Sequence, residues 1–124
     1  MAKPGKGGIE RVVDAFGYSM KGISAAWRSE AAFRQEAVLA MVLTPAAFFV
    51  ARDLIDLVLL LGSVLIVLIV ELLNSAIEAV VDRIGSELHV LSGQAKDMGS
   101  AAVFFSLLLC SITWSAIIYL HYFS

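Results

Sequence analysis

The C-terminal segment of the chain, residues 98–124, contains no Asp, Glu, Lys or Arg over 27 residues. A helix needs about 20 predominantly apolar residues to cross the hydrocarbon core of a bilayer. Toward the far end of the segment stand side chains typical of the membrane–water interface, namely Trp114, Tyr119, His121 and Tyr122. The segment therefore predicts a membrane-spanning helix over about residues 98–122.

Two further spans are predicted upstream. Residues 57–81 begin with the apolar run LVLLLGSVLIVLIV, which is followed by several polar residues. Residues 37–51 carry no charge but are only 15 in number, so this span must begin near residue 31 and hold Arg34 and Glu36 at its inner end. Pro45 can kink this helix, which neighbouring helices tolerate in a span.

The connections between the predicted spans are short and polar. Arg52, Asp53 and Asp56 form a tight turn between the first two spans, which makes them antiparallel neighbours. Residues 85–94 (GSELHVLSGQ) contain three turn-forming residues and are expected to be a polar connection.

The composition supports a membrane protein of one domain. Of the 124 residues, 60% are hydrophobic and 16% are charged, whereas soluble domains have about 45–50% and about 25%. In water, so apolar a chain would expose large hydrophobic patches, which lipid can cover. The same figures exclude a disordered or nucleic-acid-binding protein, so no nucleic-acid partner is expected.

Residues 9–28 form an amphipathic helix that we expect to lie on the membrane surface. Its apolar residues recur at helical spacing, while charged residues lie off that face. Basic residues and a Trp beside such a face are typical of interfacial helices. The alternative is a core-packing helix of a soluble bundle. The apolar positions are Ile9, Val12, Val13, Phe16, Met20, Ile23 and Trp27.

The positive charges predict the orientation. Six of the nine Lys and Arg residues lie in the first 34 positions, and Arg83 and Lys96 lie in the second connection. Only Arg52 belongs to the first turn. Because cytoplasmic segments carry an excess of Lys and Arg, the N-terminus and the second connection are expected in the cytoplasm, with the C-terminus outside.

A polar stripe interrupts the second span. Its five members are Glu71, Asn74, Ser75, Glu78 and Asp82. They lie 0, 3, 4, 7 and 11 positions after Glu71, so they share one helix face. A charged side chain at membrane depth costs about 2.5–3.5 kcal/mol at a helix centre, and the chain offers Arg34 and Lys96 as pairing cations. The stripe could hold Mg²⁺, supply a general base, relay protons or cations, or join helices of an oligomer. The spacing does not choose among these.

Lys96 and Asp97 stand at the start of the third span, among the small residues Gly93, Gly99 and Ala101. A lysine at this rim could hold phosphates as a point charge, with small residues allowing close approach. Neither the GxxxxGK[ST] loop nor the protein-kinase motifs are present. Any ATP site here would therefore use another scaffold.

Four ordered motifs resemble the bacterial diacylglycerol kinases. They are GYSMKG over 17–22, EAAFRQE over 30–36, ELLNSAIEAVVDRIG over 71–85 and AKDMGSAA over 95–102. The resemblance covers nearly the whole chain. It implies an all-α integral membrane kinase of the bacterial inner membrane, with a surface helix and three membrane helices per subunit. It also implies a homotrimer whose active sites are shared between subunits.

The resemblance implies transfer of the γ-phosphoryl group of MgATP to the hydroxyl of diacylglycerol, giving phosphatidic acid. Glu71 would be the general base on the lipid hydroxyl, Asn74 would orient it or contact a phosphate, and Glu30 and Glu78 would hold Mg²⁺. The nucleotide would be surrounded by Arg11, Tyr18, Glu87, His89, Lys96 and Asp97. The lipid would contact the surface helix, Ala32, Phe33, Arg34, Gln35, Glu36, Ser100 and Trp114.

Two alternatives remain at this point. An undecaprenol kinase shares the scaffold and phosphorylates a long polyprenol; the run from Glu78 to Glu87 favours diacylglycerol. A non-enzymatic helical subunit would use the stripe as an ion or proton path, and it would turn over no ATP.

Overall fold

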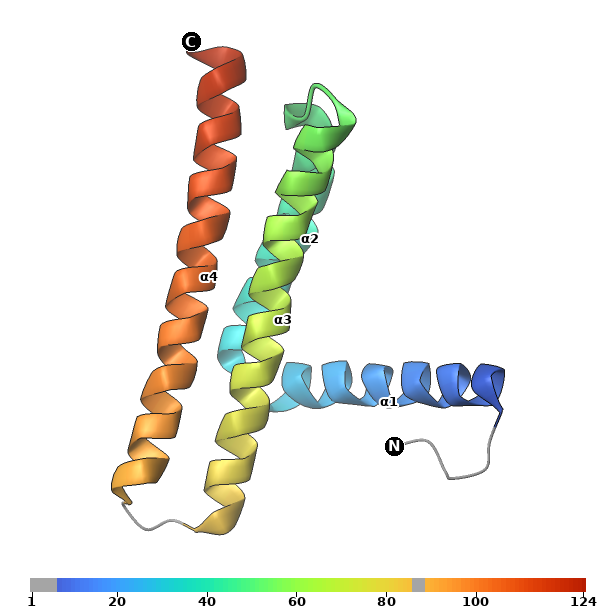
Figure 1. Ribbon diagram of the computed structural model, residues 1–124, viewed down its shortest axis with the longest axis vertical. Coiled ribbons are helices and arrows are strands. Elements are labelled where there is room, and N and C mark those ends of the chain that lie inside the picture. The colour runs from blue at the N-terminus through green and yellow to red at the C-terminus, as the bar shows by residue number, and fades with distance from the viewer. Residues whose placement is uncertain (1–6, 86–88) are drawn as a thin grey trace.

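The computed structural model describes residues 7–85 and 89–124, and its regular secondary structure within these ranges is entirely helical. The helices are α1 (Gly8–Ser29), α2 (Ala31–Val50), α3 (Leu54–Ile84) and α4 (Val90–Tyr122). Helices α2, α3 and α4 run alongside one another, whereas α1 runs across them (Figure 1). The C-terminus lies at the same end as the turn between α2 and α3, and the end of α3 and the start of α4 lie at the opposite end.

Three helices, α2, α3 and α4, are long and apolar enough to cross a membrane. This confirms the expectation of an all-helical chain with three such segments. With 31 and 33 residues, α3 and α4 are about 46 and 50 Å long at about 1.5 Å per residue. The hydrocarbon core is about 30 Å thick, so both helices are longer than a bilayer core requires.

Helix α4 begins earlier than the expected polar connection over residues 85–94 allows. Its first residue is Val90, so Ser92 and Gly93 are helical rather than part of a loop. The side chain of His89 accepts a hydrogen bond from the backbone N–H of Leu91 at 3.0 Å. This cap satisfies one of the free N–H groups of the first turn, and the length of the helix outweighs the cost of one glycine.

Helix α3 is the centre of the packing. It contacts α2 on one side and α4 on the other. Leu60 is fully buried and forms the main core cluster with Ala47 of α2 and Ile117 of α4, and Trp114 packs against it. Most other large apolar side chains are exposed, which suits a chain whose surroundings are lipid rather than water.

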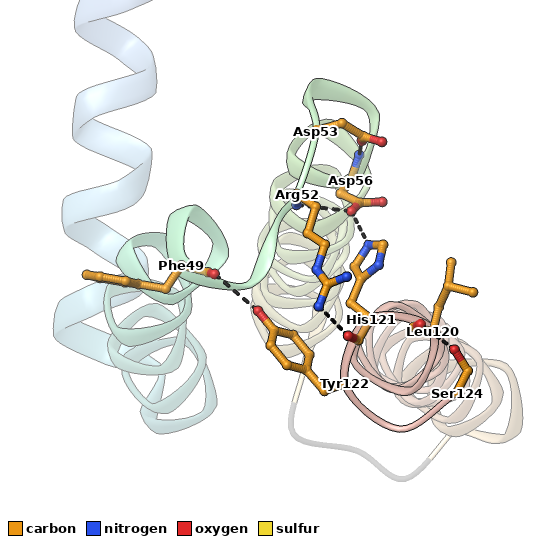
Figure 2. A network of polar contacts seen from close by, with 8 residues as sticks. All are labelled: Phe49, Arg52, Asp53, Asp56, Leu120, His121, Tyr122 and Ser124. Atoms are coloured by element: carbon orange, nitrogen blue, oxygen red, sulfur yellow. Dashed lines mark hydrogen bonds and ion pairs between the residues drawn. The ribbon is translucent and has the colours of Figure 1, made fainter.

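A polar network joins the C-terminal end of α4 to the turn between α2 and α3 (Figure 2). Asp53 caps α3 by accepting a hydrogen bond from the backbone N–H of Asp56 at 2.8 Å. The Asp56 carboxylate in turn accepts from the backbone N–H of Arg52 at 3.2 Å and pairs with His121 Nε2. Arg52 donates to the backbone carbonyl of His121 and stacks 5.0 Å from the ring centre of Tyr122. The expected polar turn and the end of the expected aromatic belt thus meet in one network of side chains. We call this network the clasp; it consists of Arg52, Asp53, Asp56, His121 and Tyr122.

Helix α1 leaves its apolar face uncovered by the rest of the chain. Ile9 is 83% exposed and Phe16 is 66% exposed, and Ala26 is the one buried residue of the helix. The break between α1 and α2 falls at Glu30, whose backbone is extended. Arg34 fastens this corner because its guanidinium donates to the backbone carbonyl of Trp27 at 2.7 Å.

Candidate functional site

The first residues of the polar stripe on α3 are buried, where neighbouring helices pack against α3. Glu71 is 2% exposed, and Asn74 and Ser75 are each 8% exposed. One and two turns further on, Glu78 is half-buried and Asp82 is exposed. The stripe therefore runs from a closed interior to the surface along one helix face.

Carboxylates from three segments gather around Glu71. Glu36, on the first turns of α2, lies beside it, and Glu78 and Glu30 lie within electrostatic range of it. Packing carboxylates against their mutual repulsion costs free energy, and such clusters mark functional sites. Across residues 7–85 and 89–124, no three His, Cys, Asp or Glu side chains are close enough to hold a metal ion by themselves.

Asn74 and Gly99 mark the closest approach of α3 and α4 near the site. Gly99 is buried, and the Asn74 amide fills the space where another residue would carry its Cβ. Asn74 Oδ1 and Ser75 Oγ are both buried, and neither has a hydrogen-bond partner within residues 7–85 and 89–124. Two polar groups of the stripe are thus enclosed without a partner in the described part of the chain.

Lys96 is the cation that α4 brings to the stripe. Its Nζ lies 2.7 Å from an Asp82 carboxylate oxygen, and both side chains are partly exposed. Of the two cations considered as partners of the stripe, Lys96 pairs with it, whereas Arg34 serves the α1–α2 corner instead.

Two grooves flank the last turns of α1, and they differ in character. The first, of about 430 Å³, lies between α1 and α3 and is lined by Ser19, Ser29, Glu30 and Ser75 among small residues. The second, of about 640 Å³, lies between α1, α2 and α3 and is almost wholly apolar, with Trp27, Phe33 and Pro45 in its wall. Ile23 and Leu72 line both, so the two grooves adjoin, and the first differs from the second by its few polar side chains.

Several of the expected site residues lie apart from this cluster. Trp114 packs in the core, 14 positions and about 21 Å along α4 from Ser100. Arg11 and Tyr18 are exposed on α1, ahead of the residues that line the grooves. Ala32, Gln35, His89, Asp97 and Ser100 are exposed. Glu87 lies outside the described residues.

Two features of the site were not foreseen from the sequence. Glu36 was expected at the lipid, but its contact with Glu71 joins residues 35 positions apart on different helices. Ser75 was placed on the stripe from the sequence. Its position in the wall of the first groove, between α1 and α3, depends on where α1 lies. The close approach of Asn74 to Gly99 could have been anticipated from the small residues around Lys96, because small residues allow helices to pack closely.

Comparison with known proteins places the whole chain in one family. The model of the prokaryotic diacylglycerol kinases matches residues 17–118. The diacylglycerol kinase of Escherichia coli strain K12 is 55% identical over 115 residues, covering 93% of this chain and 94% of that protein. Those of Pseudomonas aeruginosa (50% over 114 residues, covering 92% and 93%) and Haemophilus influenzae (46% over 112 residues, covering 90% and 95%) are similar too.

Proposed function

Because the chain belongs to the prokaryotic diacylglycerol kinase family, we propose that it transfers the γ-phosphoryl group of ATP to the free hydroxyl of diacylglycerol and releases phosphatidic acid and ADP. The observation that carries the site assignment is the burial of Glu71 among Glu36, Glu78 and Glu30. A carboxylate held there is shielded from water.

Glu71 is the general base of this proposal. As the lipid hydroxyl oxygen attacks the γ-phosphorus, Glu71 accepts the hydroxyl proton, and the bond from the γ-phosphorus to the oxygen of ADP breaks. Phosphoryl transfer depends chiefly on positioning and charge neutralisation, and a positioned base adds about 10²–10⁴-fold. Glu36, in contact with Glu71, holds the carboxylate in place.

Glu30 and Glu78 are the residues that fit a magnesium ion. Mg²⁺ is usually held by one or two carboxylates together with substrate phosphates, so the lack of a three-ligand cluster among the described residues suits this metal. When bound, the ion neutralises phosphate charge. Both carboxylates lie within electrostatic range of Glu71, which supports their assignment beside the proposed base.

Lys96 and Asp97 on α4, with His89 at its start, are proposed to face the nucleotide. Lys96 adjoins the exposed end of the stripe through Asp82, so its charge is available to phosphates there. Glu71 and Glu78 are about 10 Å apart along the helix axis, which allows the first to serve the lipid and the second the metal.

The two grooves suggest how the lipid is held. In this proposal, glycerol and its hydroxyl lie in the first groove beside Glu30 and Ser75, and the acyl chains lie in the second groove against Trp27 and Phe33. The uncovered apolar face of α1 supports its placement in the membrane interface. The cytoplasm would then hold the N-terminus and the start of α4.

A homotrimer with shared sites is proposed for the same chain. Arg11 and Tyr18 lie on α1 ahead of the groove residues, so they would meet a nucleotide in a neighbouring subunit rather than their own. Asn74 Oδ1 and Ser75 Oγ of the stripe and Glu36 Oε2 beside it have no hydrogen-bond partner among the described residues, which supports contacts from outside the subunit.

The test is transfer of labelled γ-phosphate from MgATP to diacylglycerol in mixed micelles. Glu71→Gln, which keeps the shape of the side chain and removes the base, should lose about 10²–10⁴-fold in kcat. Glu10→Gln, on the exposed first turn of α1, is the matched control and should keep parental activity.

Three other results of this assay would change the assignment. Faster phosphorylation of undecaprenol than of diacylglycerol in matched micelles would replace the lipid assignment, and absence of ATP turnover with either lipid would favour an ion path. Equal activity of Glu71→Gln and the parent would remove Glu71 from its role.

A further inference from the structure

Gly99 differs from the other glycines of the chain in what surrounds it. Of the seven glycines whose surroundings the structure defines, six face open space within 4 Å of an added Cβ. At Gly99 an added Cβ would overlap Asn74 Oδ1 and lie 3.2 Å from Asn74 Cγ. The absent side chain of Gly99 is therefore the space that the Asn74 amide occupies.

The contact fixes the Asn74 amide without a strong hydrogen bond. Asn74 Oδ1 is buried and has no hydrogen-bond partner among the described residues, and it lies against the backbone of Gly99. A Cα–H group can donate a weak hydrogen bond to such an oxygen. With the oxygen enclosed here, the NH₂ group is the end of the amide that remains to donate elsewhere.

Asn74 shares its helix face with two carboxylates of the site. Asn74 follows Glu71 by three positions and precedes Glu78 by four, so all three share one helix face. An NH₂ donor between them can hold either a carboxylate or a phosphate oxygen during transfer.

We propose that Gly99 is a positioning residue: its missing side chain seats the Asn74 amide oxygen and so turns the amide NH₂ toward the site between Glu71 and Glu78. This inference rests on the proposed kinase function and adds a residue to it. Gly99 touches no substrate and acts through Asn74.

The first test is Gly99→Ala in the phosphoryl-transfer assay, normalised to folded trimer. The added methyl must displace the amide, and misplacement by about 1 Å can cost about 10²-fold. We expect kcat to fall by about 10- to 100-fold while KM for ATP changes by less than about threefold, because the donor acts on the transferring group. Gly62→Ala, within α3 and with open space around it, should keep parental kcat.

A double-mutant cycle separates this role from general damage. In an Asn74→Ala background the methyl of Gly99→Ala meets no amide, so the second change should lower kcat by less than about twofold further. A full additional loss in that background, or parental kcat in Gly99→Ala alone, would overturn the proposal.

The same cycle read by thermal unfolding requires no activity. Gly99→Ala should lower Tm in the parent and not in the Asn74→Ala background; equal shifts in both would refute the contact. If Gly99→Ala does not fold, recovery of folded protein in the double variant supports the contact and its absence overturns it. A parent without kinase activity would reject the proposed function, which this unfolding result does not depend on.

Discussion

Replacing Leu60 by Ala tests where the stability of the helix bundle resides. Leu60 has no exposed surface and is the one large side chain of the described residues that is completely enclosed, between Ala47 and Ile117. Its neighbour Leu59 is 50% exposed on the same helix. The two positions differ in packing but share residue type, helix and membrane depth.

The expected loss of stability in Leu60→Ala has two parts, the transfer of the removed carbons and the cavity that they leave, and only the cavity part applies in a bilayer. Buried Leu→Ala changes in water-soluble cores cost about 2.7–5.0 kcal/mol. The change removes three carbons, whose transfer from water at about 0.8 kcal/mol each contributes about 2.4 kcal/mol. In lipid this part is absent, because the separated helices are also in an apolar solvent. The cavity part remains, so Leu60→Ala should cost about 1–2 kcal/mol.

The assay is reversible unfolding in mixed micelles of a mild detergent and dodecyl sulfate, followed by circular dichroism. Leu59→Ala should change the free energy of unfolding by less than about 0.5 kcal/mol. Equal costs at the two positions would refute the reasoning, since packing within α2, α3 and α4 would then not distinguish them. A cost above about 3 kcal/mol for Leu60→Ala would also refute it, because a water-transfer contribution would then be required.

Three further predictions concern charged groups. Lys96→Met should leave the free energy of unfolding nearly unchanged, since its bridge to Asp82 is exposed, but it should raise KM for ATP at least about tenfold in steady-state kinetics; an unchanged KM would place the nucleotide elsewhere. His121→Ala removes the partner of the buried Asp56 carboxylate and should cost about 1–3 kcal/mol in the same unfolding assay, with kcat retained, whereas unaltered stability would show that the pair contributes nothing. Glu78→Gln should raise the Mg²⁺ concentration needed for half-maximal activity, and an unshifted magnesium titration would remove it as a ligand.

The membrane helices could be predicted because each corresponds to one continuous apolar stretch of the sequence. Residues 98–124 and 57–70 are apolar without interruption by charge, and the structure has helices through both. The start of α4 was less accessible. Ser92 and Gly93 are common in turns, but the His89 cap and the packing of a long helix outweigh their local preference.

The site was predictable along one helix and not between helices. The spacing of Glu71, Asn74 and Glu78 places them on one face from sequence alone. The contact of Glu36 with Glu71 and the seat of Asn74 at Gly99 join distant positions. Such contacts depend on how α2 and α4 dock against α3, which no local pattern records.

The clasp of Arg52, Asp56 and His121 has a consequence for how the chain enters the membrane. His121 lies 65 positions after Asp56 and 69 after Arg52, at the end of α4. In the proposed orientation, Arg52 and Asp56 have already crossed the bilayer when α4 begins to insert. Until α4 has passed through completely, the Asp56 carboxylate lacks its imidazole partner. The clasp can therefore close only after α4 is fully inserted, which distinguishes a chain with all three helices inserted from one arrested before α4.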